Sequence, residues 1–381
     1  MWILSIIISI ALILLTLIDA FETIVQPRRV THRYRFARLY YTIAWQAWRV
    51  IAVRVRSHRK REAFLSVFGP LSMIGLLCTW LLILIGAFAL FHFSLHTPLS
   101  DHAEDHGFGA YLYFSGTTLF TLGYGDITPT HALGRVAAVI ESGLGFAFLA
   151  VIISYLPVLY QAYSQRETTI GLLDARAGSP PTAGEFLTRI ARGGNFHNID
   201  AILAEWERWA TELLEIQLSF PVLTYYRSQH DNQCWLAALA MILDTCALLL
   251  VEVKRANTYQ SQLTFATARH AVVDLSLILK ARPDLPSDVR FSRAQREQLR
   301  SALANAGVPL IDEDTEARLT ELRAMYEPFL FALAERFLFD IPPIVSSIEN
   351  NADNWQRSAW MQRAPAIGSL PVARVDGEHF D

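Results

Sequence analysis

Long apolar runs alternate with polar segments in the first half of the chain. The runs cover residues 2–18, 63–91 and 136–163, and they carry almost no charged side chain. About 20 predominantly apolar residues cross a bilayer as a helix. The pattern therefore predicts three membrane-spanning helices, the first of them within residues 1–26, and an all-α membrane protein.

The second half of the chain predicts a separate all-α domain over residues 186–360. Apolar side chains in 199–218 recur at helical spacing and put Leu203, Trp206 and Leu213 on one face. The other segments are expected to be a Gly/Pro/Ser-containing linker and a flexible tail, at residues 164–185 and 361–381.

Residues 234–251 leave two interpretations open. The run is apolar and nearly long enough to span a bilayer. Asp244 lies near its centre, where a carboxylate costs about 2.5 to 3.5 kcal/mol on insertion. We interpret the run as a buried core helix, and an additional membrane segment stays as the alternative.

Positive charge is concentrated in residues 27–62, where no acidic side chain precedes Glu62. Short loops rich in Lys and Arg stay on the cytoplasmic side of a membrane. We therefore expect this segment and the chain after residue 163 to be cytoplasmic, and the N-terminus to be outside. The aromatic stretch from Leu39 to Trp48 suits an amphipathic helix on the inner face, where the arginines would meet anionic lipids.

A voltage sensor is a further reading of the basic segment. Arg29, His32, Arg35 and Arg38 recur every third residue, as gating charges do. The segment is too polar to span a bilayer, and one membrane helix precedes it where a sensor needs four. We interpret these residues as part of a lipid-facing basic surface.

An enzymatic role has weak support. His230 and Cys234 are four residues apart, with Asp231 and Asp244 nearby, as a thiol nucleophile and its base could be. A polar helix edge with a buried thiol explains the same residues. No Gly-x-Gly-x-x-Gly sequence opens a strand and a helix, and no nucleic acid-binding module is recognisable. We expect no enzymatic activity, no organic cofactor and no nucleic acid partner.

The sequence FTLGYGD, at residues 120–126, stands between two predicted spans. The preceding residues, 108–120, are too few to cross a bilayer and read as a re-entrant half-helix. Irregular backbone at membrane depth is tolerated where it is buried in protein or lines a water-filled path. Gly123 and Gly125 can adopt positive φ and turn successive carbonyls to one side. We therefore expect a column of carbonyl oxygens, which would attract a cation.

Thr121 to Asp126 resembles the T-V-G-Y-G-D selectivity filter of the potassium channel family. The resemblance covers residues 63–163 and implies an outer helix, a pore half-helix, a filter and an inner helix, at 63–93, 108–120, 121–126 and 134–163. It implies that filter backbone binds K⁺ and that the chain is a homotetramer. The implied filter residues are Thr121, Leu122, Gly123, Tyr124 and Gly125, with Asp126 at the pore mouth.

The inner helix carries three further candidates. Gly145 stands where the family has its hinge glycine, and Pro157 is expected to bend the helix near a gate. Glu141 lies one turn before Gly145, and an acid inside a membrane segment is a functional candidate. Its structural alternative is a hydrogen bond to a half-helix hydroxyl such as that of Thr117 or Thr118.

Some residues depart from the family pattern. Leu122 replaces a β-branched residue, Phe120 replaces a threonine, and Thr117 stands where some members have a glutamate that braces the filter. The Tyr124 ring is expected to pack against half-helix aromatics, Tyr113 and Phe114.

The segment before the half-helix contains His92, His96, His102 and His106, with acidic residues at 101, 104 and 105. Histidines among acids can sense protons or hold a metal. A polar loop at the membrane surface explains the same composition, so both readings stay open.

These features together predict a multi-pass protein of the bacterial inner or plasma membrane. We expect a potassium-selective channel, gated at the inner helix and modulated by the cytoplasmic helical domain. The alternative is a non-selective cation channel, or a membrane receptor whose helical domain is the working part.

Overall fold

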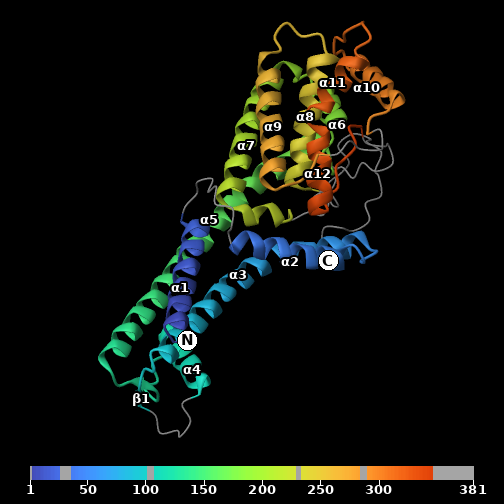
Figure 1. The fold of residues 1–381 in the computed structure, drawn as a ribbon. Coiled ribbons are helices and arrows are strands. Elements are labelled where there is room, and N and C mark those ends of the chain that lie inside the picture. Colours follow the sequence, from blue (N-terminus) through green and yellow to red (C-terminus); the bar gives the residue numbers. More distant parts are fainter. Residues whose placement is uncertain (1, 26–35, 101–106, 229–232, 284–289, 346–381) are drawn as a thin grey trace, which may run out of the picture. The chain divides into compact units, whose positions relative to one another are not determined.

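The computed structural model describes residues 2–25, 36–100, 107–228, 233–283 and 290–345. The chain divides into two compact units: Met1–Ala162 with Leu218–Tyr226, called the membrane unit below, and Tyr163–Gln217 with Arg227–Asp381, called the helical unit. Figure 1 shows that both units consist almost entirely of helices.

The membrane unit contains the helices α1, α2, α3 and α4, and most of α5. Their bounds are Trp2–Ile24, Phe36–Ala52, His58–Ser94, Phe108–Leu119 and Ala132–Ala177. Three of them, α1, α3 and α5, are long and apolar enough to cross a membrane. The expectation of an all-α membrane protein with three spans is confirmed.

The long inner helix α5 corrects one predicted boundary. The linker was expected to begin at residue 164, but α5 continues to Ala177. No proline follows Pro157 until Pro180, so nothing in residues 158–177 forces the helix to stop. The chain leaves the helix at Gly178, which has a φ of 83°.

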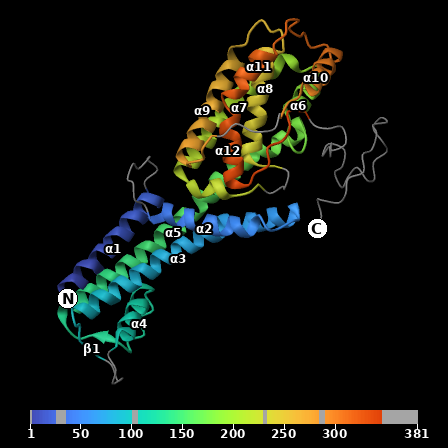
Figure 2. The same ribbon diagram turned by 45° about the vertical axis from the view of Figure 1, so that its right-hand side comes forward.

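Helix α1 lies antiparallel to α3 in the membrane unit. The Trp2 and His96 rings lie 4.3 Å apart at one end of the pair. At the other end, the Trp80 indole of α3 donates a 3.0 Å hydrogen bond to Asp19 of α1. The N-terminus therefore lies at the same end of the unit as the loop between α3 and α4, as Figure 2 shows.

Asp19 also joins α1 to α2. Its carboxylate accepts the backbone N–H of Ala37 at 3.0 Å, in the first turn of α2. A carboxylate at this position satisfies a helix N–H that has no partner within the helix and complements the helix dipole. One acidic side chain thus ties the additional N-terminal helix to both neighbours.

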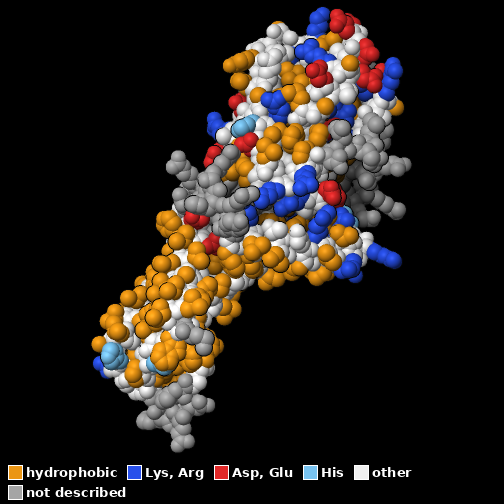
Figure 3. Space-filling view, viewed as in Figure 1, with side chains coloured by type: hydrophobic (Ala, Val, Ile, Leu, Met, Phe, Trp, Pro, Cys, Tyr) orange, Lys and Arg blue, Asp and Glu red, His pale blue; other side chains and the backbone are white. Residues whose placement is uncertain are grey.

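Helix α2 packs one face against the membrane unit and leaves other apolar side chains exposed. The packed face buries Ala37, Trp45 and Ala52. Leu39 and Ile43 are more than half exposed. The amphipathic helix expected over residues 39–48 is therefore present, and Figure 3 shows apolar side chains covering much of the membrane unit.

A segment from the second half of the chain belongs to the membrane unit. It contains the short helix η2 (Pro221–Tyr225). The Tyr225 ring contacts the rings of Tyr41 and Trp45 on α2 and of Phe68 on α3. The next residue, Tyr226, covers Gly69 so closely that a Cβ at Gly69 would clash with its ring.

The helical unit is built around α8 (Trp235–Val251), in which every side chain except Leu250 is buried. The surrounding helices are α6 (Ala183–Arg192), α7 (Ile199–Ser219), α9 (Tyr259–Ile278), α10 (Arg293–Asn305), α11 (Glu316–Ala324) and α12 (Glu327–Phe337). Burial within a helix bundle favours the core-helix interpretation of residues 234–251 over an additional membrane segment.

The charge within α8 is compensated. Asp244 accepts two hydrogen bonds from the Arg290 guanidinium, at 2.9 and 2.5 Å, and one of 2.7 Å from the Tyr326 hydroxyl. Burial works against the charge of Arg290, but Asp244 outweighs it and holds the pKa of the guanidinium above its usual value. A paired acid of this kind fits a protein core.

Candidate functional site

The half-helix α4 supports the sequence that follows it. The Thr117 carbonyl, near the end of α4, accepts the N–H of Leu122 at 2.8 Å and that of Gly123 at 3.4 Å. The Thr118 carbonyl accepts the N–H of Thr121 at 3.0 Å. The start of the predicted filter is therefore hydrogen-bonded to the last turn of α4, and the position of α4 sets the position of the filter.

The filter backbone alternates in conformation. Thr121, Gly123 and Gly125 have φ angles of 57°, 55° and 77°, whereas Leu122 and Tyr124, between them, do not have positive φ. Alternation between left-handed and ordinary backbone allows successive carbonyls to face the same side. A β-branched residue at positive φ costs of order 1 to 3 kcal/mol and is typical of a functional segment. The positive φ expected of Gly123 and Gly125 is thus present, and the carbonyl-lined path stays a prediction.

A hydrogen bond and a pair of short strands hold the end of the predicted filter and the residues after it. The Tyr113 hydroxyl of α4 donates a 2.8 Å hydrogen bond to Asp126. The strands β1 (Leu99–Ser100) and β2 (Thr128–Pro129) pair antiparallel and join the segments that flank α4 and the filter. Tyr124 is 69% exposed within one chain, and its expected contact with Tyr113 and Phe114 stays a prediction.

Gly145 is a point of close packing in α5. A Cβ at this residue would clash with the carbonyl carbon and oxygen of Leu119, at the end of α4. At Gly143, by contrast, a Cβ would meet no atom of the same chain within 4 Å. Gly145 therefore lets the inner helix approach the half-helix, while α5 runs on unbroken through Gly145 and Pro157.

Glu141 is fully buried, and the half-helix hydroxyl beside it is that of Ser115 rather than that of Thr117. The Thr117 hydroxyl donates to the Phe114 carbonyl of its own helix. The polar neighbours of Glu141 are His92 on α3, with Nε2 and Oε2 3.6 Å apart, and Ser115 on α4. His92 was expected in the outer loop and is instead fully buried within α3.

The other candidates do not form a site among the described residues. The acidic and histidine residues at 101–106 lie outside them, as do Arg29, His32, Arg35, His230 and Asp231. The Cys234 sulfur caps α8 by accepting the Ala237 N–H at 3.2 Å. The described parts of the chain contain no group of three or more His, Cys, Asp or Glu residues placed to hold a metal.

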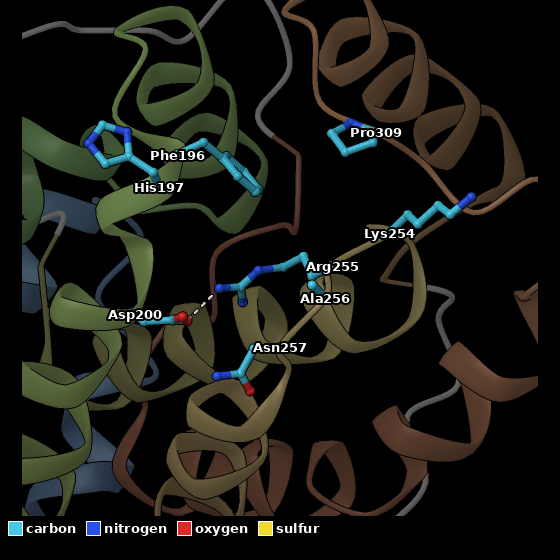
Figure 4. A pocket seen from close by; sticks show the side chains of 8 residues that line it. All are labelled: Phe196, His197, Asp200, Lys254, Arg255, Ala256, Asn257 and Pro309. Carbon is cyan, nitrogen blue, oxygen red and sulfur yellow. Dashed lines mark hydrogen bonds and ion pairs between the residues drawn. The ribbon is translucent and has the colours of Figure 1, made fainter.

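The helical unit contains a pocket of about 250 Å³, shown in Figure 4. Two of its lining residues are basic, but the Arg255 guanidinium is bonded to Asp200 at 2.5 Å and to Ser261 at 2.9 Å. The Lys254 and His197 side chains point away from each other in Figure 4. The pocket therefore presents no convergent set of cationic groups.

The region around the filter matches a known family. Residues 76–161 fit the family model described as ion channel. These residues form an ion-channel domain. The domain runs from Leu76 in α3 through α4 and the predicted filter to Gln161 in α5.

Two curated proteins are similar to the chain. The uncharacterized membrane protein YdjJ of Bacillus subtilis (strain 168) is 26% identical over 258 residues, which cover 66% of this chain and 72% of YdjJ. Protein LctB of Geobacillus stearothermophilus is 49% identical over 43 residues, which cover 11% of this chain and 31% of LctB. No solved structure matches the chain. The similarity to YdjJ is too long for the ion-channel domain alone to account for it.

Sequence reasoning missed both polar neighbours of Glu141, which are His92 and Ser115. Ser115 carried no signal, because a serine in an apolar half-helix is compatible with many environments. His92 could have been found, since it precedes the predicted end of the outer helix by one residue and so belonged to a membrane segment.

Proposed function

We propose that the protein is a potassium-selective channel that conducts K⁺ passively across the cell membrane. The observation that carries the proposal is the alternating positive φ at Thr121, Gly123 and Gly125, held at the end of α4 within an ion-channel domain. Carbonyl oxygens of residues 121–124, with the Thr121 hydroxyl, would replace the water around a K⁺ ion. Asp126 would attract cations at the outer mouth.

The proposed assembly is a homotetramer. One chain supplies one wall of a filter, and K⁺ filters are closed by four such loops. Within one chain Phe120, Leu122 and Tyr124 are 52%, 53% and 69% exposed. Neighbouring copies would cover these apolar side chains, which are costly to leave in water.

The proposed orientation places the filter mouth and the N-terminus outside, and the helical unit in the cytoplasm. Helix α2, which carries Arg38 and Arg49, supports it, because α2 lies at the opposite end of the membrane unit from α4. Helix α2 would lie in the inner membrane surface, with Leu39, Ile43 and Val50 in the acyl region. Its flanking arginines would bind anionic lipids.

The proposed gate is the part of α5 beyond Gly145, and the helical unit is its proposed modulator. Two covalent connections support modulation. Helix α5 runs from the membrane unit into the helical unit, and the segment Leu218–Tyr226 returns from the helical unit to pack on α2 and α3. A change in the helical unit would therefore reach both the inner and the outer helix.

A flux assay tests the proposal. Purified protein in liposomes should admit K⁺ in preference to Na⁺, and the assembly should have the mass of four chains. Gly123→Ala should abolish the flux, because Gly123 has a positive φ that a Cβ strains. Gly86→Ala is the control, since a Cβ there meets no atom within 4 Å. Equal K⁺ and Na⁺ flux would favour a non-selective cation channel, and absence of flux would favour a receptor.

A further inference from the structure

Three helices of the membrane unit meet at a buried polar cluster behind the filter. It consists of His92 on α3, Ser115 on α4 and Glu141 on α5, each 0% exposed. The imidazole Nε2 lies 3.6 Å from the Glu141 carboxyl, and Ser115 is the second polar neighbour of that carboxyl. Within the described residues, His92 Nε2, Ser115 Oγ and both Glu141 oxygens make no hydrogen bond.

Such a cluster is costly in an apolar surrounding. Buried polar groups are normally hydrogen-bonded, and groups left unsatisfied in a native structure are often functional or bind water. The cost is partly offset by a contact on the other side of the imidazole, where Nδ1 lies 3.3 Å from the Thr97 hydroxyl. The Phe114 ring packs edge-on against the same imidazole.

The cluster lies one helical turn from the close contact between Gly145 and Leu119. Ser115 and Leu119 are one turn apart on α4, and Glu141 and Gly145 are one turn apart on α5. The half-helix thus rests on the inner helix at two successive turns, first through Ser115 and Glu141 and then through Leu119 and Gly145. The Thr117 carbonyl, which carries the filter, lies between these two levels.

The chemistry of the pair limits its charge. With one proton between them, a carboxyl and an imidazole have no net charge, whichever group holds the proton. Adding a second proton or removing the first leaves one net charge in a fully buried place, which is unfavourable. An arrangement with no net charge is therefore the one that this buried place favours, and it leaves the contact with α4 unchanged.

We propose that His92 and Glu141 form a pair of positioning residues, with no net charge, that holds the pore half-helix through Ser115 in the place that supports a conducting filter. The proposal rests on the proposed channel function. In this proposal the outer and inner helices brace the pore half-helix. Thr117 does not have this role, because its hydroxyl donates to a carbonyl within α4.

Other titratable groups on the surrounding elements have partners of their own. Tyr111 and Tyr113 of α4 donate to the Thr97 carbonyl and to Asp126. His96 after α3 contacts the Ser94 carbonyl, and Arg135 of α5 donates to the Pro129 carbonyl. On α1, Asp19 accepts from Ala37 and Trp80. None of these contacts involves His92 or Glu141.

The test compares wild type with His92→Leu, Glu141→Leu and the double variant in liposomes, with K⁺ flux measured at acid, neutral and alkaline pH. In His92→Leu, alkali would place a negative charge on a buried carboxyl that has lost its facing imidazole, so flux should fall about tenfold on alkalinisation. In Glu141→Leu, acid would place a positive charge on a buried imidazole that has lost its facing carboxyl, so flux should fall about tenfold on acidification.

The double variant and the wild type should both keep their flux across this range, because neither holds an unpaired titratable group in the cluster. Replacing a buried pair by apolar side chains is often tolerated, whereas removing one partner is not. Single variants with the same pH profile as the wild type would overturn the proposal. So would a double variant that is impaired as severely as the single variants.

A second readout separates this proposal from the proposed function. Taken relative to the double variant, the thermal unfolding midpoint should fall with rising pH in His92→Leu and with falling pH in Glu141→Leu. If wild type carries no K⁺ flux, the channel proposal fails and the midpoints test the pair alone. Midpoints of both single variants that change with pH in the same direction would overturn the pair.

Discussion

One buried cluster in each unit shows how differently acidic side chains can be satisfied. In the helical unit, Asp244 is paired with Arg290 and Tyr326, and Glu327 with Arg290 and Arg323. In the membrane unit, the carboxyl of Glu141 and the facing imidazole nitrogen of His92 make no hydrogen bond within the described residues. Asp244 and Glu141 are both buried, so the difference lies in how completely each carboxyl is hydrogen-bonded.

The two clusters illustrate two roles that buried polar side chains can have in a protein. A fully bonded network fixes the packing of a core, and losing one member leaves the others unpaired. An incompletely bonded cluster contributes little stability by itself, and it persists where the surrounding helices hold it. We infer that the helical cluster maintains a fold, whereas the membrane cluster maintains the position of α4. The predictions below test this contrast, from the largest expected effect to the smallest.

Removing Arg290 should give the largest loss of stability. Arg290→Met leaves Asp244 buried with the Tyr326 hydroxyl alone, and breaking a buried pair costs about 3 to 5 kcal/mol. The midpoint of thermal unfolding of the full chain, followed by circular dichroism, should fall. The control is Arg293→Met, at an exposed position on α10. Equal midpoints for the two variants would show that the network adds no stability.

Enlarging Gly145 should impair conduction more than it lowers the stability of the helical unit. Gly145→Val forces the inner helix away from Leu119, and overpacking of this kind costs about 1 to 3 kcal/mol. K⁺ flux in liposomes should be lost, while Gly143→Val retains most of it. If the two variants conduct equally, the contact of α4 with α5 does not control the filter.

Removing Asp19 should loosen the N-terminal helix. Asp19→Ala leaves the Ala37 N–H and the Trp80 indole N–H unpaired, at about 1 to 3 kcal/mol. Hydrogen exchange should rise at the start of α2, with a smaller change around Trp80. Ser9→Ala is the control, since that hydroxyl bonds within its own helix. Unchanged exchange at Ala37 would contradict the capping role.

The smallest effect is expected at a helix end of the helical unit. Ser292 and Gln295 form a capping box at the start of α10. Ser292→Ala should cost about 1 kcal/mol of stability, because the Gln295 N–H loses its acceptor. Chemical denaturation of the full chain measures the loss. If Ser292→Ala were as destabilising as Arg290→Met, the proposed order of the effects would be wrong.

The sequence was sufficient for features that depend on local chemistry. Gly123 and Gly125 predicted positive φ, because glycine adopts it without steric cost. The apolar runs predicted the spans, and the compensated Asp244 agrees with the preferred interpretation of residues 234–251. Thr121 was not expected at positive φ, since a β-branched side chain disfavours it.

Contacts between distant segments could not be read from the sequence. Asp19 contacts Ala37 and Trp80 only when three helices have packed together. The residues near Asp19 in the sequence do not indicate these partners. Gly145 matched a family hinge, yet its close contact with Leu119 requires the path of α4. The extent of α5 was underestimated, because its polar last turns resemble a linker in composition and still form a helix.

The most direct test of the channel proposal is the reversal potential of the purified protein in planar bilayers or liposomes under a K⁺ gradient with Na⁺ on the opposite side. We predict that the potential follows the K⁺ equilibrium potential as the gradient is varied. A potential that stays near zero, or that follows Na⁺ or Cl⁻, would contradict a potassium-selective filter at residues 121–126.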